Sequence, residues 1–189
     1  YSPVYEKGLK EKYPQFGTYT IQDAQNPGNR GRIDYTLKGF HASYTLDGTK
    51  IIINPVFRDR TDIYAVYNKF AYHAIPSDRV PFECLHHEHG MLDEEVTAPM
   101  GSSSLRSANV DLLQYRIAVA TTGEYALYHG GNVSQVLAEI VTAINRVNDV
   151  YEVDLGIRLI LIADNDKIIF LDPATDDYTT VSYTHLRAH

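Results

Sequence analysis

The chain has 189 residues, of which 44% are hydrophobic, and this is enough for one ordinary domain or two small ones with a packed core. Its net charge of −7, without any basic run or basic–aromatic alternation, argues against a nucleic-acid partner. No apolar run approaches the ~18 residues of a membrane span, and no signal sequence is visible. The chain starts with Tyr1 rather than Met, which suggests a processed or truncated product.

The first half of the chain has the pattern of an antiparallel β-meander. The stretch "GLKEKYPQFGTY" predicts a short helix or turn that breaks at Pro14. Residues 32–72 then contain the β-rich runs "IDYTL", "FHASYTL", "TKIIINPVF" and "DIYAVYNKFAY". Asp47 and Gly48 separate two of these runs, and this pair is typical of a type I′ hairpin turn, in which both central residues have positive φ.

The nine residues "FECLHHEHG", at positions 82–90, combine the only cysteine with several other metal-binding side chains. A zinc hydrolase helix uses H-E-x-x-H, because histidines four residues apart project from one face. That spacing fails here, since position 91 is Met91 rather than histidine. Pro81 and Gly90 also leave little room for a helix. The stretch is therefore not a catalytic motif, and a solvated polar loop remains the alternative to a metal site; its histidines are His86, His87 and His89.

A change of composition divides the chain after this stretch. The sequence "LDEEVTAPMGSSSLRSAN" is rich in Ser, small and acidic residues and has no apolar periodicity, as expected of an exposed linker. We therefore expect a β-rich region at residues 1–90, a linker at 91–113 and a second region at 114–180.

The second region has the pattern of a βαβ unit. "YRIAVAT", residues 115–121, alternates as a strand does, and "IRLILIA", residues 157–163, is an apolar run typical of a strand buried on both faces. Between them, a long amphipathic helix is expected, with Asn132 as its N-cap and Gln135 three residues later. A strand, helix and strand with this spacing predict a right-handed crossover and a parallel pair. The apolar residues of the helix are Val133, Leu137, Ile140, Val141, Ile144, Val147 and Tyr151.

Several candidate sites in this region have simpler structural interpretations. The loop before the helix lacks both G-x-G-x-x-G and the P-loop pattern, so a nucleotide site is not expected. Asn132 heads a formal glycosylation sequon, but its N-cap role explains it more economically. Glu124 and His129 could serve acid–base chemistry, but structural roles are expected. The acidic stretch lacks a calcium-loop spacing, so turns are favoured over a calcium site for Asp164, Asp166, Asp172, Asp176 and Asp177.

Residues 114–179 carry four distinctive runs: "YRIAVATTGEY", "HGG", "IVTAINRVNDVYE" and "DPATDDYT". They resemble the start of the catalytic domain of bacterial secreted, reprolysin-like zinc metallopeptidases of the metzincin group. The resemblance implies an α+β or α/β chain: a β-rich antiparallel prodomain, then the N-terminal βαβ part of the protease domain. In such enzymes the H-E-x-x-H-x-x-G-x-x-H helix and a Met-turn come later, and this sequence is expected to be truncated before them.

The last nine residues, 181–189, depart from that family pattern just after Thr179. The run "VSYTHLRAH" is expected to be a non-native tail. Its histidines His185 and His189 are four residues apart, but Leu186 stands where the protease motif has glutamate.

The resemblance implies a precursor of a secreted zinc-dependent metalloendopeptidase that acts on proteins or peptides, with no catalytic residue in this chain. Prodomains of such enzymes often offer a cysteine to the zinc, which makes Cys84 a candidate inhibitory ligand. The alternative for Cys84 is a buried or incidental free thiol, and a single cysteine excludes an internal disulfide. Arg116 stands near the position where relatives place a calcium-binding glutamate, so calcium is not carried over. The alternative function is a noncatalytic secreted module that binds a protein or glycan.

Overall fold

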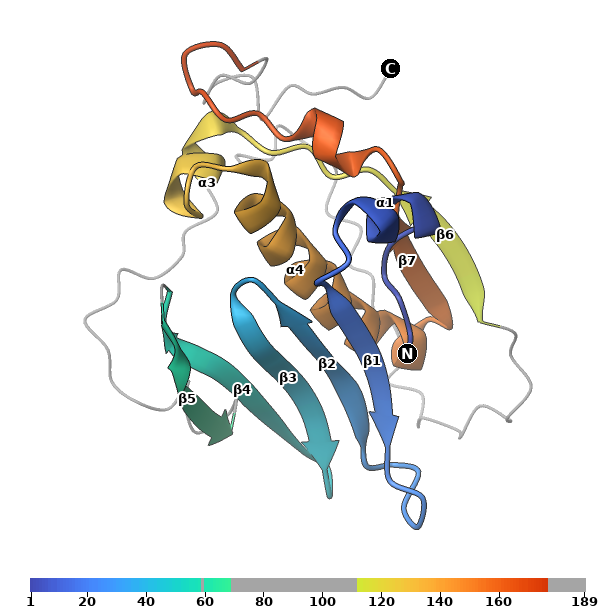
Figure 1. The fold of residues 1–189 in the computed structure, drawn as a ribbon. Helices are drawn as coiled ribbons and strands as arrows, with labels where there is room; N and C mark the ends of the chain where they lie inside the picture. The colour runs from blue at the N-terminus through green and yellow to red at the C-terminus, as the bar shows by residue number, and fades with distance from the viewer. Residues whose placement is uncertain (59, 69–111, 177–189) are drawn as a thin grey trace, which may run out of the picture.

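The computed structural model of the chain describes residues 1–58, 60–68 and 112–176 (Figure 1). It is a mixed α+β structure in which one long helix lies between two sheets. No helix within these ranges is long and apolar enough to cross a membrane.

The larger sheet is the antiparallel meander that the sequence predicts. Its strands pair in chain order, and in the hairpin between the third and fourth strands Asp47 and Gly48 have φ values of 47° and 77°. Positive φ at both positions confirms the predicted turn. The strands are β1 (Gly17–Gln22), β2 (Arg30–Thr36), β3 (Gly39–Leu46), β4 (Thr49–Phe57) and β5 (Arg60–Asn68).

The sequence prediction missed β1, because it placed the first strand after Arg32. The inward position of β1 is Thr18, which is fully buried, while the neighbouring Tyr19 is 39% exposed. The strand therefore has no buried apolar face for an alternation pattern to reveal. The short helix expected before Pro14 is confirmed as α1 (Lys7–Lys12).

The predicted βαβ unit is also confirmed. Strands β6 (Leu113–Ile117) and β7 (Ile157–Leu161) are parallel, and α4 (Val133–Asp154) connects them. The Asn132 side chain accepts a hydrogen bond of 3.0 Å from the Gln135 amide, as the N-cap prediction requires. The remaining short helices are α3 (Gly123–Tyr128) and η1 (Asn165–Ile168).

Two details of this unit differ from the prediction. Strand β6 ends at Ile117 rather than at Thr121, because the Asn165 side chain bonds both the N–H and the C=O of Val119 and draws that segment toward η1. In β7 only Leu161 is fully buried, and the other positions are partly exposed. Burial on both faces was therefore a wrong expectation, since in the described chain α4 packs against a sheet of only two strands.

The hydrophobic core lies between α4, β7 and the N-terminal segment. Helix α4 contributes an inward apolar stripe, and the first 16 residues contribute a comparable set, although the two segments are more than 100 residues apart in sequence. The N-terminal segment is thus a component of the α/β core. The buried members are Val4, Tyr5, Leu9, Phe16, Ala126, Val136, Leu137, Ala138, Ile140, Val141, Ile144, Leu161 and Ile169.

Candidate functional site at the contact between the larger sheet and helix α4

The cysteine and histidine cluster of the sequence lies outside the described residues. This applies to Cys84 and to its neighbours His86, His87 and His89, and likewise to residues 91–111 of the expected linker and to the tail with His185 and His189. The predicted boundaries at residues 90 and 180 and the latency role of Cys84 stay predictions. Within residues 1–58, 60–68 and 112–176, no group of three or more His, Cys, Asp or Glu side chains could hold a metal ion.

The acidic stretch after β7 forms ion pairs and turns. Lys12 of α1 lies 3.1 Å from the Asp164 carboxylate and 2.9 Å from that of Asp166. Hydrogen bonds from Lys12 and Lys167 lower the pKa of Asp164. Asp172 accepts the Ala174 amide in a turn, and Asp176 accepts the Gly123 amide at 2.7 Å. These partners agree with the turn interpretation; Asp177 lies outside the described residues.

The position related to a calcium-binding glutamate is occupied by a cation with its own partner. Arg116 Nε lies 2.5 Å from Glu6 Oε1. A guanidinium at this place disfavours a divalent cation.

His129 has a partner that the sequence did not reveal. Its Nδ1 is buried, makes no hydrogen bond among the described residues and lies 3.5 Å from Glu139 Oε1. The ring packs against Tyr125 and Tyr128, with centroid separations of 4.3 Å and 4.8 Å. Glu139 is ten residues away on α4, so no local motif connects the pair. Glu124, the other acid–base candidate, is exposed on α3.

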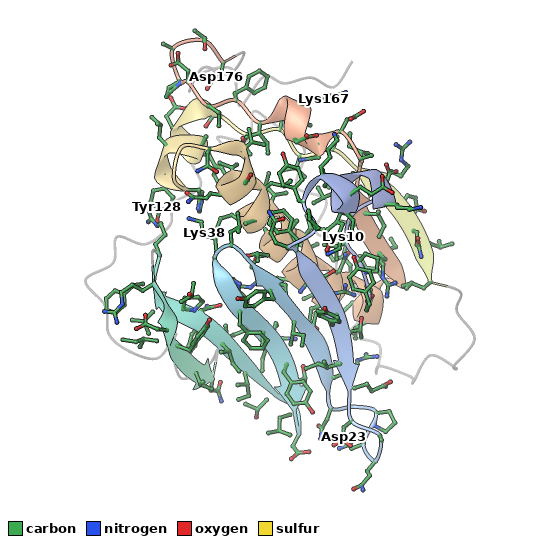
Figure 2. The ribbon with its side chains drawn as sticks, viewed as in Figure 1. Lys10, Asp23, Lys38, Tyr128, Lys167 and Asp176 are labelled. Carbon is green, nitrogen blue, oxygen red and sulfur yellow. The ribbon has the colours of Figure 1, made fainter. Side chains whose placement is uncertain are left out.

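Two cations from turns of the larger sheet lie near this histidine. Figure 2 shows Lys38, in the β2–β3 turn, at the same end of the molecule as Tyr128. Arg58 stacks over the Tyr128 ring at 3.5 Å and donates a hydrogen bond of 2.7 Å to the Tyr128 carbonyl. Burial lowers the pKa of His129, and Lys38 and Arg58 act in the same direction against the opposing charge of Glu139.

This environment predicts a pH-dependent stability. Because the folded state holds the pKa of His129 below its ordinary value of 6.5, the unfolded state takes up a proton first as the pH falls. Stability should be fully present above pH 6.5 and should decrease below it. Urea unfolding at pH 8 and pH 5.5 measures the loss, and His129→Gln should reduce it. An identical loss in wild type and His129→Gln would contradict the assignment to His129.

The inward polar residues of β2 and β3 form a second buried cluster with α4. Asp34 is 2% exposed. Its carboxylate accepts hydrogen bonds from Thr142 Oγ1 at 2.7 Å and Asn145 Nδ2 at 3.0 Å, and His41 Nδ1 lies 3.1 Å from Asp34 Oδ2. The carboxylate thus has three partners, and both side chains are buried, with His41 7% exposed. These contacts connect β2 and β3 to α4.

Arg32 fastens β2 to α4 and to the N-terminal segment. Its guanidinium donates to Asn145 Oδ1 at 2.7 Å, Glu152 Oε1 at 2.6 Å and the Ser2 carbonyl at 2.7 Å. Burial lowers the pKa of this guanidinium, and Glu152 opposes that shift. Glu152 is also held by Arg158 Nε at 2.6 Å. A cavity of about 200 Å³ lies beside this group, lined in part by Arg30, Leu112 and Val153.

Further polar pairs continue along the same contact. Asp149 on α4 accepts a hydrogen bond of 2.7 Å from Ser43 Oγ and pairs with Lys50, while Arg146 bonds the Asn54 side chain. The sequence pattern of β2 and α4 indicates this contact, although the predictions above do not include it. Polar residues alternate on β2 at Arg32 and Asp34, and a polar stripe on α4 consists of Thr142, Asn145 and Asp149.

The described molecule is thus an α/β unit with a parallel strand pair, to which an antiparallel sheet is fastened by buried polar contacts. Residues 113–186 match the model of metallo-peptidase family M12B, reprolysin-like. The match begins at the first residue of β6 and includes α4 and β7. Neither a curated protein nor a solved structure matches the chain. The match supports the resemblance to a metallopeptidase, and this family is generally zinc-dependent and acts on proteins.

Proposed function

We propose that residues 114–180 are the start of a zinc-dependent metalloendopeptidase domain of the secreted bacterial type, and that residues 1–90 are its prodomain in a proenzyme. The observation that carries the proposal is the family match that starts at β6 and includes the βαβ unit. The contact between the antiparallel sheet and α4 supports it, because a prodomain would pack against its protease domain.

The side chains of the described ranges do not fit a catalytic zinc site, because they contain no group of three metal-binding residues. The sequence also has no H-E-x-x-H spacing. We therefore assign no step of peptide hydrolysis to a residue of this chain. Its contribution to such an enzyme would be the scaffold: the strand pair, the helix α4 and the polar contact that fixes the larger sheet.

The 189-residue chain should not hydrolyse peptides, even with added zinc. The reason is the missing set of three histidines and glutamate that a zinc peptidase needs to bind the metal and activate water. Hydrolysis of a quenched generic peptide, with and without a chelator, measures this. Turnover that the chelator abolishes would place an active site in this chain and would contradict the proposal.

In a longer protein that carries the zinc helix, Cys84 would act as the inhibitory ligand. A thiolate at the fourth zinc position excludes water. Cys84→Ala should then raise the peptidase activity of the uncleaved proenzyme by at least tenfold, a change of about 1.4 kcal/mol or more. Activity of the purified, uncut protein is the measurement. Unchanged latency would assign inhibition to steric cover by residues 1–90.

One observation favours the alternative of a noncatalytic binding module. On β1 and β2, Tyr19 and Tyr35 are 39% and 60% exposed, and exposed tyrosines are frequent in protein- and glycan-binding surfaces. The coding sequence of the source gene discriminates the two functions. The motif H-E-x-x-H-x-x-G-x-x-H within about 100 downstream residues supports the peptidase, and its absence favours the binding module.

A further inference from the structure

The first six residues connect the two sheets. In Figure 1 the chain begins between β1 and β7. The Ser2 amide donates a hydrogen bond of 2.9 Å to the Thr18 carbonyl of β1, and Thr18 Oγ1 donates one of 2.8 Å to the Ser2 carbonyl. At the other end of the segment, the Leu161 amide of β7 donates to the Val4 carbonyl at 2.8 Å. The Glu6 amide donates to the Leu161 carbonyl at 2.9 Å.

These bonds join the segment in parallel to the outer edge of β7 at Leu161, the last residue of that strand. Tyr5 and Leu161 form a parallel bridge, whereas the inner edge of β7 pairs with β6. A strand edge offers regularly spaced N–H and C=O groups, which an extended peptide can use whatever its sequence. Specificity must therefore come from side chains.

The side chains of the segment occupy well-defined surroundings. Val4 is fully buried and Tyr5 is 3% exposed, both within the core formed by α4 and β7. The Tyr5 hydroxyl donates a hydrogen bond of 2.7 Å to the Phe16 carbonyl. The surroundings of these two adjacent positions therefore favour an apolar residue at the first and an aromatic residue at the second.

The surroundings of the position after Tyr5 favour an acidic residue. Glu6 Oε1 accepts from Arg116 Nε at 2.5 Å, and Glu6 Oε2 accepts from the Ala163 amide at 2.8 Å. Arg116 lies on β6 and Ala163 follows β7, so the carboxylate connects both strands of the small sheet. These two donors recognise a carboxylate at a fixed distance from the β7 edge.

We propose that the outer edge of β7 is a binding site for an extended apolar–aromatic–acidic peptide, and that Val4, Tyr5 and Glu6 are its resident ligand within the chain. The site takes such a peptide in trans when its own segment is absent. The assignment is independent of the peptidase proposal, because it uses only contacts within the described residues.

A chain that starts at Lys7, with a labelled peptide of residues 1–7, tests the site by fluorescence anisotropy. Saturable one-to-one binding is expected. A Val4→Asp peptide should bind at least about tenfold more weakly, because it would bury an unpaired carboxylate. A Lys7→Ala peptide is the matched control, since the Lys7 side chain is 91% exposed, and it should bind as the parent does. A folded short chain that binds no peptide, or binds all three equally, would overturn the proposal.

A charge reversal tests the acidic position. A Glu6→Arg peptide should lose about tenfold in affinity for the short chain, since it places two cations together. The Arg116→Glu short chain should recover part of that loss with the same peptide. Equal affinity of the Glu6→Arg peptide for both short chains would contradict the role of Arg116.

Hydrogen exchange of the full chain gives an answer even if the short chain does not fold. If the segment is a separable ligand, the Leu161 amide should open locally, at lower free energy than the buried helix. Arg116→Glu should then reduce the protection of Leu161 severalfold and leave that of Val141, in the middle of α4, unchanged. Equal changes at both amides, or no change at Leu161, would show that the segment is an inseparable part of the core.

Discussion

Replacement of Arg32 by alanine should lower the free energy of unfolding by about 3–5 kcal/mol, the range observed when one partner of a buried ion pair is removed. The Arg32 side chain is 1% exposed and its partner Glu152 is 14% exposed. Alanine would leave the Asn145 oxygen without its donor and would remove one of the two donors to the Ser2 carbonyl. Urea unfolding followed by circular dichroism measures the loss.

The matched control is Arg60→Ala. Arg60 also bonds a carboxylate, that of Asp62, at 2.6 Å, but the two side chains are 54% and 62% exposed. Exposed pairs of this kind contribute little to stability, because water and salt screen them, so Arg60→Ala should have a much smaller effect. Equal effects of the two substitutions would show that the contact between β2 and α4 does not depend on its buried polar groups.

The buried polar groups also explain why the sheet has one position on the helix. An apolar contact can slide with little loss, whereas the carboxylate of Asp34 keeps its partners on α4 only at one register. A shift of β2 by one residue would turn Asp34 to the other face of the sheet. The buried polar contacts of Asp34 therefore define one register of β2 on α4.

The sequence predicted correctly the structural features that are determined by residues close together in the chain. The parallel strands, the N-cap at Asn132 and the turn at Asp47 and Gly48 each depend on neighbouring residues, and all three are confirmed. The reprolysin-like resemblance depends on a continuous run of residues, and the family match supports it.

The missed features depend on residues that are distant in sequence. His129 lies next to Glu139 because α3 and α4 pack against each other. Arg32 donates a hydrogen bond to Asn145, which is more than 100 residues away in the sequence. The N-terminal residues Val4 and Tyr5 enter the core of a unit that begins at β6. Such pairings need the three-dimensional position of α4, which hydrophobic periodicity alone does not supply.

The core substitution Leu137→Ala should lower the free energy of unfolding by about 2–5 kcal/mol, since it removes buried methyl groups and leaves a cavity. Leu137 is fully buried on the apolar face of α4. Its control is Leu127→Ala on α3, where the side chain is 61% exposed and where a change within about 0.5 kcal/mol is expected. A similar loss in both variants would contradict the position of Leu137 in the core.

The same pair of experiments tests whether the described residues unfold together. Leu137 lies on the face of α4 that packs against β7 and the N-terminal segment, whereas Arg32 connects the helix to the larger sheet. Because α4 belongs to both contacts, Leu137→Ala and Arg32→Ala should each shift one common transition to lower urea. Two separate transitions, each moved by only one of the substitutions, would mean that the antiparallel sheet unfolds independently of the βαβ unit.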